Sequence, residues 1–178
     1  MINLPIITKR LVIRRFVTKD MPAYLEFMLD PESTKYLAFD HDQKTRKGAT
    51  ELFNFVLSSY ESDQVIHAYA IALANTDEYV GSCGFSPYQG SIVECYYTIN
   101  PQHQRQGYGF EAMTALLKSL KASPLVTEIR AYCNQDNIAS INLAKKLCMD
   151  YRGNSFHLQS GLEGVLYRLI VEQHSVIQ

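Results

Sequence analysis

The residues best suited to chemistry form a short loop with two glycines, residues 104–109. It lies between an apolar segment and an amphipathic one, so it is expected to join a strand to a helix. Gly107 and Gly109 remove side chains where the backbone must turn sharply and let a ligand approach. The N–H groups and positive dipole end of the next helix would add an anion cradle, and Arg105 adds a formal charge. The loop therefore predicts a phosphate or pyrophosphate site.

Two better-known phosphate motifs do not fit this loop. A dinucleotide-binding loop needs a third glycine at a fixed spacing, and Ala112 does not fill that place. A P-loop needs Gly-Lys-Ser/Thr, which the chain lacks. A tight strand-to-helix turn without a ligand stays open as the alternative interpretation, because many such loops have this shape.

The composition is that of an ordinary globular chain. Its 178 residues are 47% hydrophobic and 20% charged, which suits one domain, residues 1–178, with a sizeable core. A formal net charge of −1 without a long basic run predicts no nucleic-acid partner. No stretch of 18 apolar residues could span a membrane, and Lys9, Arg10, Arg14 and Arg15 interrupt any secretory signal. A cytoplasmic protein is therefore expected.

The cysteines indicate neither a metal site nor a disulfide framework. Cys83, Cys95, Cys133 and Cys148 form no C-x-x-C pair, and their spacings fit no usual zinc pattern. Three of the four lie in apolar runs, so buried free thiols in a reducing compartment are expected. A nucleophilic cysteine would need a histidine partner that the spacing does not supply.

Hydrophobic periodicity predicts the elements that must hold the loop. They are a strand at 11–13, a helix after Asp20, a helix around 53–60, strands at 67–73, 79–85 and 92–99, a helix ending before Pro124, a strand at 128–133, a helix at about 137–147, and a hairpin of 156–159 with 165–171. The first three long strands should be antiparallel, since their connections are too short for a crossover. A right-handed crossover would lay 128–133 parallel to 92–99. The fold class is α/β with a mixed sheet.

Finer expectations concern segments beside these elements. Residues 31–45 are polar and should be irregular, and residues 87–90 should turn between two strands. In the last helix, Ile141, Ala144, Leu147 and Cys148 should point inward.

The loop reads Gln104-x-x-Gly107-x-Gly109, and it resembles the coenzyme A loop of the GNAT acetyltransferases. Further motifs resemble the RimJ/RimL-type branch of that superfamily: Gly107 to Ala112, Thr8-x-Arg10-Leu11-x-Ile13-Arg14 with Asp20 after it, Asn137-x-x-Ser140 followed by Lys146-Leu147, and Tyr167-Arg168-Leu169. The likeness covers roughly residues 8–170.

This resemblance implies an acyl-CoA N-acyltransferase fold, an antiparallel meander plus a splayed parallel strand pair with helices on both faces. The pantetheine arm of acetyl-CoA would lie in the splay, a backbone N–H would polarise the thioester carbonyl, and the amine would attack directly. No metal is implied. The cofactor-binding residues so implied are Tyr97, Thr98, Ile99, Gln104, Arg105, Gln106, Gly107, Tyr108, Gly109, Asn137 and Ser140.

The chain departs from that pattern at three places. Cys148-Met149 stands where the branch usually has Gly-Phe, and Tyr96 stands where a glycine usually precedes Tyr97. Ala144 lies seven residues after Asn137, where many superfamily members carry a tyrosine acid.

Acetylation of an amine requires loss of a proton, because the pKa is about 8 for an α-amino group and about 10.4 for a lysine-like amine. Glu94, a carboxylate in an apolar strand just before the loop, is the candidate base; a carboxylate paired with Arg or Lys is the alternative. The resemblance implies Ser140 as donor to the leaving thiol, with a simple helix cap as its alternative. Tyr97 and Tyr132 are weaker donors, and His67 is expected to be a hydrogen-bonded core residue.

The acceptor is the least determined feature. The RimJ/RimL-type branch is best known for acetylating N-terminal α-amino groups of ribosomal proteins, and relatives modify polyamines and antibiotics. A groove is expected between segment 31–45, the second helix and the last hairpin, with mixed charges. A protein or peptide N-terminus is preferred by family likeness, and a small primary amine follows. A noncatalytic coenzyme A-binding regulatory module, a plain nucleotide-phosphate binder and a homodimer stay open.

Overall fold

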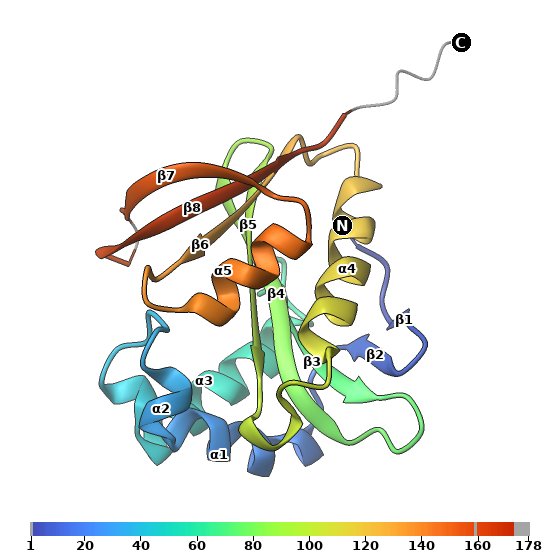
Figure 1. Cartoon of the computed structure of the whole chain (residues 1–178). Helices are drawn as coiled ribbons and strands as arrows, with labels where there is room; N and C mark the ends of the chain where they lie inside the picture. Colours follow the sequence, from blue (N-terminus) through green and yellow to red (C-terminus); the bar gives the residue numbers. More distant parts are fainter. Residues whose placement is uncertain (1, 159, 173–178) are drawn as a thin grey trace.

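A computed structural model describes residues 2–158 and 160–172, in which eight strands form one mixed sheet in the order β1-β2-β3-β4-β5-β6-β8-β7 (Figure 1). The strands are β1 (Ile6–Ile7), β2 (Leu11–Arg14), β3 (Ala68–Leu73), β4 (Tyr79–Gln89), β5 (Ile92–Ile99), β6 (Glu128–Cys133), β7 (Asp150–His157) and β8 (Leu162–Ile170). The helices are α1 (Met21–Leu29), α2 (Pro31–Thr34), α3 (Arg46–Ser59), α4 (Tyr108–Lys121) and α5 (Ile138–Lys146). The 3₁₀ turns are η1 (Thr18–Asp20), η2 (Asp42–Lys44) and η3 (Pro101–His103).

The parallel pair predicted from the crossover is confirmed, and it is short. β5 and β6 pair only from Ile92 with Glu128 to Glu94 with Arg130. Beyond these residues the two strands diverge toward α1 and α2, as Figure 1 shows. The other neighbours in the sheet pair antiparallel, so β5 and β6 form the one parallel pair among the described strands. Divergence leaves backbone groups of β5 facing a gap, where a ligand can pair with them.

The helices cover both faces of the sheet. α4 and α5 lie on one face, and α1 to α3 lie on the other (Figure 1). The stripe expected on the helix after the loop is confirmed, because Met113, Leu116, Leu117 and Leu120 are all at most 4% exposed. Burying a side chain of this size stabilises the fold by roughly 1.5–3 kcal/mol. This stripe fixes the position of α4, and therefore the position of the loop before it.

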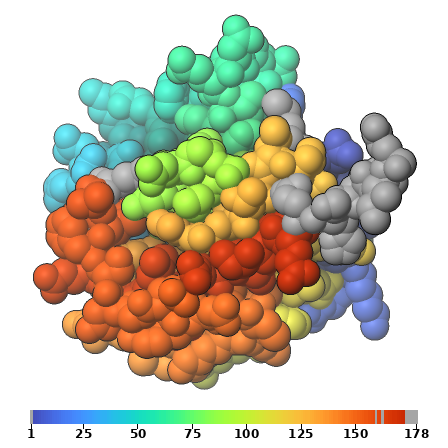
Figure 2. Space-filling model, turned by 90° about the horizontal axis from the view of Figure 1, so that it is seen from above, coloured from blue at the N-terminus to red at the C-terminus, as the bar shows by residue number. Residues whose placement is uncertain are grey.

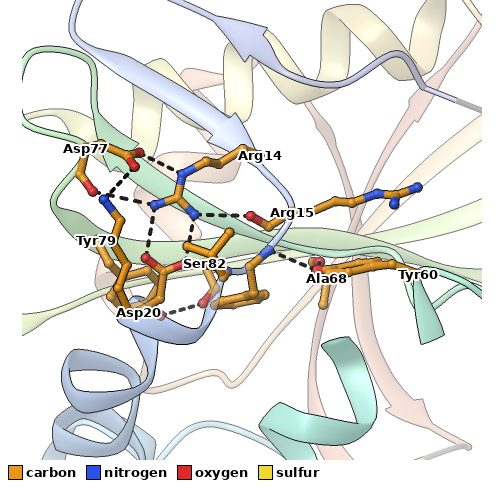
Figure 3. A network of polar contacts seen from close by, with 11 residues as sticks. Arg14, Arg15, Asp20, Tyr60, Ala68, Asp77, Tyr79 and Ser82 are labelled. Atoms are coloured by element: carbon orange, nitrogen blue, oxygen red, sulfur yellow. Dashed lines mark hydrogen bonds and ion pairs between the residues drawn. The ribbon is translucent and has the colours of Figure 1, made fainter. Parts of the chain in front are cut away.

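An ion-pair network centred on Arg14 ties β2 to Asp20 and to Asp77 (Figure 3). Arg14 donates two hydrogen bonds to Asp20, at 2.7 and 2.9 Å, and a third to Asp77 at 2.7 Å. Asp20 is 1% exposed. The hydrogen bond to Asp20 is the largest of the influences that raise the pKa of Arg14. Asp20 was expected to cap α1, but its carboxylate is occupied by Arg14 and the Val17 N–H instead.

Three expectations about the connecting segments were wrong. β4 continues through Pro87 to Gln89, because the strand tolerates a bulge there opposite β5. Residues 31–45 are not irregular throughout: they contain α2 and η2, since Asp30 caps the backbone N–H groups of Glu32 and Ser33. β7 starts at Asp150, well before the predicted hairpin strand, and the predicted end at Gln159 lies outside the described residues.

The end of α5 corrects the expectation for Cys148. This residue is exposed and has φ 58°, in the left-handed region. Its N–H donates to the Lys145 carbonyl, and the Met149 N–H donates to the Ala144 carbonyl. This is the Schellman pattern, in which the chain reverses after the helix and the next residue packs back on it. Met149 is accordingly buried, and Cys148 turns outward. Cys83, Cys95 and Cys133 are buried free thiols, as expected.

Candidate active site

The loop at 104–109 has the geometry of an anion site. Gly107 is the N-cap of α4 with φ 80°, a conformation that favours glycine. Arg105 has φ 59° and is exposed. The first turn of α4 leaves its N–H groups without intrahelical acceptors, so they and the positive end of the helix dipole face the same space. The loop can therefore hold a phosphate group, as its sequence predicts.

The N-terminal motif holds this loop in place from behind. Glu111 of α4 accepts hydrogen bonds from the Thr8 hydroxyl at 2.7 Å, the Arg10 N–H at 2.8 Å and Arg10 Nε at 2.6 Å. Burial opposes ionisation of Glu111, but the bonds from Thr8 and Arg10 outweigh it and lower the pKa of Glu111. Arg10 also donates to the Gln106 carbonyl at 2.9 Å. Two motifs separated in sequence thus form one clamp.

A cavity of about 590 Å³ begins at this loop and passes through the gap between β5 and β6. Its lining includes ten of the predicted cofactor-binding residues: Tyr97, Thr98, Ile99, Gln104, Arg105, Gly107, Tyr108, Gly109, Asn137 and Ser140. Gln106 is not in the lining, and Gln104 donates its amide to the Ile99 carbonyl at 3.0 Å. Lys146 of α5, next to the Phe110 ring, adds a cation to the loop end of the cavity.

The start of α5 brings the Ser140 hydroxyl close to the side chains of Cys133 and Tyr97 in the gap. The Asn137 carboxamide oxygen accepts from the Ser140 N–H at 3.1 Å and so caps the helix. The Ser140 hydroxyl lies 3.3 Å from the Cys133 Sγ. Burial raises the pKa of Tyr97 to about 12, while a hydrogen bond with Ser140 opposes the rise. Ser140 therefore faces the gap from α5, where Tyr97 faces it from β5.

On the opposite face the cavity reaches α1 and α2. Phe27, Ser33, Tyr36 and Leu37 line it there, together with Tyr96 of β5. Tyr96 is 38% exposed, yet its hydroxyl end lies over Gly84 on the neighbouring strand, and burial raises its pKa above the usual range. The bulky residue that replaces the family's usual glycine thus forms a wall of this end of the cavity.

Glu94 is paired, but not with arginine or lysine. Its Oε2 lies 2.8 Å from Nε2 of His157, and each side chain is 15% exposed. The other ring nitrogen of His157, Nδ1, lies 2.6 Å from the Ser160 hydroxyl. Glu94 is not in the cavity lining, whereas Tyr132, whose ring centroid is 5.0 Å from that of His157, is.

Sequence reasoning missed His157 because β7 and β5 are separated by two strands in the sheet. The β7–β8 hairpin, orange and red in Figure 2, folds toward the α1–α3 face. Tyr132 crosses Gly164 to donate a hydrogen bond to the Ser155 carbonyl on β7. A Cβ on Gly164 would meet the Cys133 carbonyl oxygen at 2.2 Å and the Tyr132 ring at 3.0 Å, so glycine is needed first for the close approach of β6 and also leaves room for the ring. The two glycines at 161 and 164 were the only signal in the sequence that the hairpin could bend there.

His67 has a hydrogen-bond partner, as expected, but it is half-buried rather than a core residue. Its ring stacks on Phe85 with centroids 4.3 Å apart, and its Nδ1 lies 2.8 Å from the Tyr69 hydroxyl. Burial lowers the pKa of His67. Within residues 2–158 and 160–172, no group of three or more His, Cys, Asp or Glu side chains could hold a metal ion. In that same part of the chain no helix combines the length and apolar character needed to cross a membrane.

A mixed sheet with a splayed parallel pair, a glycine loop before α4 and a cavity through the splay define an acyl-CoA-binding fold. The sequence matches the acetyltransferase (GNAT) domain family over residues 10–150. It is 30% identical over 149 residues to the uncharacterized N-acetyltransferase YnaD of Bacillus subtilis, a match that covers 83% of this chain and 84% of that protein. The chain therefore belongs to the GNAT acetyltransferase family and is an acyl-CoA-dependent acetyltransferase.

Solved structures show the same fold. A GNAT-family acetyltransferase from Bacillus anthracis superposes with a TM-score of 0.79 at 24% identity, covering 96% of this chain and 100% of that one. RimL, a ribosomal L7/L12 alpha-N-protein acetyltransferase in complex with coenzyme A, superposes with a TM-score of 0.73 at 18% identity, covering 94% of this chain and 97% of that one.

Proposed function

We propose that the chain transfers the acetyl group of acetyl-CoA to a primary amine, and that the preferred acceptor is the N-terminal α-amino group of a protein or peptide. The observation that carries the proposal is the cavity, which runs from the α4 loop through the β5–β6 gap to the face that α1 and α2 cover. A cofactor held at the loop and an amine entering from the α1–α2 side would meet at the gap. Acetyl-CoA supplies the acetyl group as an activated thioester.

The cofactor end of the cavity is assigned to the loop and α5. The N–H groups of the α4 first turn and the cations Arg105 and Lys146 suit the phosphates. The backbone of β5 between Tyr97 and Ile99 suits the pantetheine arm, because β6 does not pair with it there. In such a position a β5 N–H can polarise the thioester carbonyl.

Ser140 is assigned to the departing thiol. Its hydroxyl faces the gap next to Tyr97 and Cys133, and its backbone N–H is held by Asn137. A hydroxyl fixed in this way can donate a hydrogen bond or a proton to the sulfur as the carbon–sulfur bond breaks.

Two features support an N-terminal α-amino group as the acceptor. The acceptor end is walled by Phe27, Tyr36, Leu37 and Tyr96, which suit an extended peptide or an apolar side chain better than a polycation. Among structural neighbours, RimL acts on ribosomal protein L7/L12, and a Salmonella typhimurium acetyltransferase modifies the N-terminal serine of that protein. Those likenesses are to the fold, so the acceptor itself is a matter for experiment.

The assignment of the loop is tested by calorimetry with acetyl-CoA. Gly107→Asp adds a negative charge at the helix N-terminus that faces the phosphates, and we expect affinity to fall by about tenfold or more. Gly90→Asp is the matched control, because Gly90 also has a positive φ, 57°, but lies in the β4–β5 turn with open space around it. Unchanged affinity in a folded Gly107→Asp variant would show that the phosphates bind elsewhere.

A further inference from the structure

Acetyl transfer to an ammonium releases two protons from nitrogen, and this inference, which rests on the proposed function, concerns the second of them. The nitrogen enters with three protons and leaves as an amide with one. The thiolate of coenzyme A takes one proton, on the side of Ser140. The other needs an acceptor on the side where the amine enters.

No carboxylate lies in the cavity lining among the described residues, and the one imidazole there is His103. His103 is on η3, at the loop end, and its Nε2 faces Glu78 at 3.3 Å. It is therefore placed on the cofactor side rather than on the amine side. A carboxylate and an imidazole of the right chemistry, Glu94 and His157, lie outside the lining and next to Tyr132, which is part of it.

The contacts of His157 fix its tautomer. Nδ1 receives the Ser160 N–H at 3.2 Å and lies 2.6 Å from the Ser160 hydroxyl, so Nδ1 carries the lone pair. Nε2 must then carry the proton, which it donates to the Glu94 carboxylate at 2.8 Å. The contacts of Nδ1 and of Nε2 therefore indicate the same tautomer. Taking a proton at Nδ1 requires the Ser160 N–H to give up its bond to that nitrogen, and the Glu94 carboxylate at Nε2 would then stabilise the resulting cation.

Polar and charged groups face His157 from three elements. Facing it are Glu94 from β5, the Tyr132 ring from β6 and Ser160 from the hairpin turn, while Glu163 of β8 lies near Tyr132. Arg130, which pairs with Glu94 in the sheet register, donates to Glu128 instead at 2.6 Å. The charged group that contacts the imidazole is therefore the Glu94 carboxylate.

We propose that His157 takes the proton that the acceptor amine gives up, through the Ser160 hydroxyl or one water beside Tyr132, with Glu94 as its positioning residue. The amine nitrogen forms the new bond to the acetyl carbon and the carbon–sulfur bond breaks. One nitrogen proton moves to Nδ1 of His157, and the imidazolium is held by Glu94. This reverses the sequence-based assignment, in which Glu94 itself was the base.

The test measures kcat/KM against pH for the wild type, His157→Gln and Glu94→Gln, with the best acceptor amine. His157→Gln should lower kcat/KM by about 10²-fold or more and flatten the acidic limb. Added imidazole should restore part of the loss. Glu94→Gln keeps a hydrogen-bond acceptor but removes the charge that stabilises the imidazolium, so its acidic limb should move to lower pH. A merely structural pair would lose activity at every pH alike.

Four results would overturn the inference. His157→Gln could keep the wild-type profile, or His103→Gln could be the variant that flattens the acidic limb instead. If His157→Gln folds poorly, an unmoved acidic limb in Glu94→Gln decides against it. A wild-type chain that acetylates no amine removes the proposed function and this inference together, whereas an active wild type with any of the three earlier results removes the inference alone.

Discussion

At the scale of single residues, a substitution at Ser140 tests the proposed catalytic role separately from cofactor binding. Its hydroxyl faces the gap, but its backbone N–H already caps α5 through Asn137. Ser140→Ala removes the first contact and keeps the second. We expect kcat to fall by roughly 10²-fold while acetyl-CoA affinity changes little. Steady-state kinetics and calorimetry measure the two effects, and Ser140→Thr, which keeps a hydroxyl, should recover part of kcat. Equal losses in both quantities would make Ser140 a binding residue.

Arg14 carries the fold rather than the chemistry. Arg14→Met leaves Asp20, which is 1% exposed, without its partner, so the free energy of unfolding should fall by about 3–5 kcal/mol. Arg15→Met is a neighbouring control, because its ion pair with Glu61 has side chains 52% and 84% exposed. That change should cost no more than about 1 kcal/mol. Denaturant titration gives both values, and similar losses in the two variants would contradict the account of the Arg14 network.

At the scale of elements, the end of α5 stores strain that a glycine would relieve. Cys148 takes the left-handed conformation at the position where the Schellman motif usually has glycine. A side chain in that conformation costs about 1–2 kcal/mol, so Cys148→Gly should raise the free energy of unfolding by about 1 kcal/mol. Cys148→Ala keeps the Cβ and should bring no such gain. Thermal unfolding of both variants measures this, and equal stabilities would show that the turn holds no strain.

The elements that the sequence predicted well are those with a clear hydrophobic periodicity. The apolar run at 92–99, the strand at 128–133 and the stripe on α4 all lie where their patterns placed them. The turn at the loop was predictable because two glycines follow an apolar strand and precede an amphipathic helix. The motif residues Thr8 and Arg10 were found by resemblance, and only the structure shows why they belong together, through Glu111.

The features that could not be predicted depend on contacts between distant elements. Glu94 meets His157 because the β7–β8 hairpin folds over the sheet, and no local pattern reports a bend of that kind. α2 forms because Asp30 caps it before Pro31, in a segment too short and polar to show a period. Cys148 looked like part of an apolar helix face, but backbone reversal after Leu147 turns it outward.

At the scale of the whole molecule, the divergence of β5 and β6 opens the gap that connects the two faces of the sheet. One face of the sheet carries α4 and the glycine loop before it, and the other carries α1 and α2. The gap joins them, so a thioester and an amine can approach from opposite sides without either crossing the sheet edge. Membership of the GNAT family agrees with this arrangement. In the proposed function, the walls of the α1–α2 end of the cavity select the amine.

The most direct test of the account is an acetyl-CoA thiol-release assay across N-terminal peptides, polyamines and aminoglycosides, with the product of each active reaction identified by mass spectrometry. We expect turnover with one or more peptides, with the acetyl group on the α-amino nitrogen, and much weaker turnover with free polyamines or drugs. Strong turnover of a polyamine or an aminoglycoside with none on any peptide would contradict the proposed acceptor. If none of the amines causes thiol release, in a chain that still binds acetyl-CoA, the proposed transfer itself is contradicted.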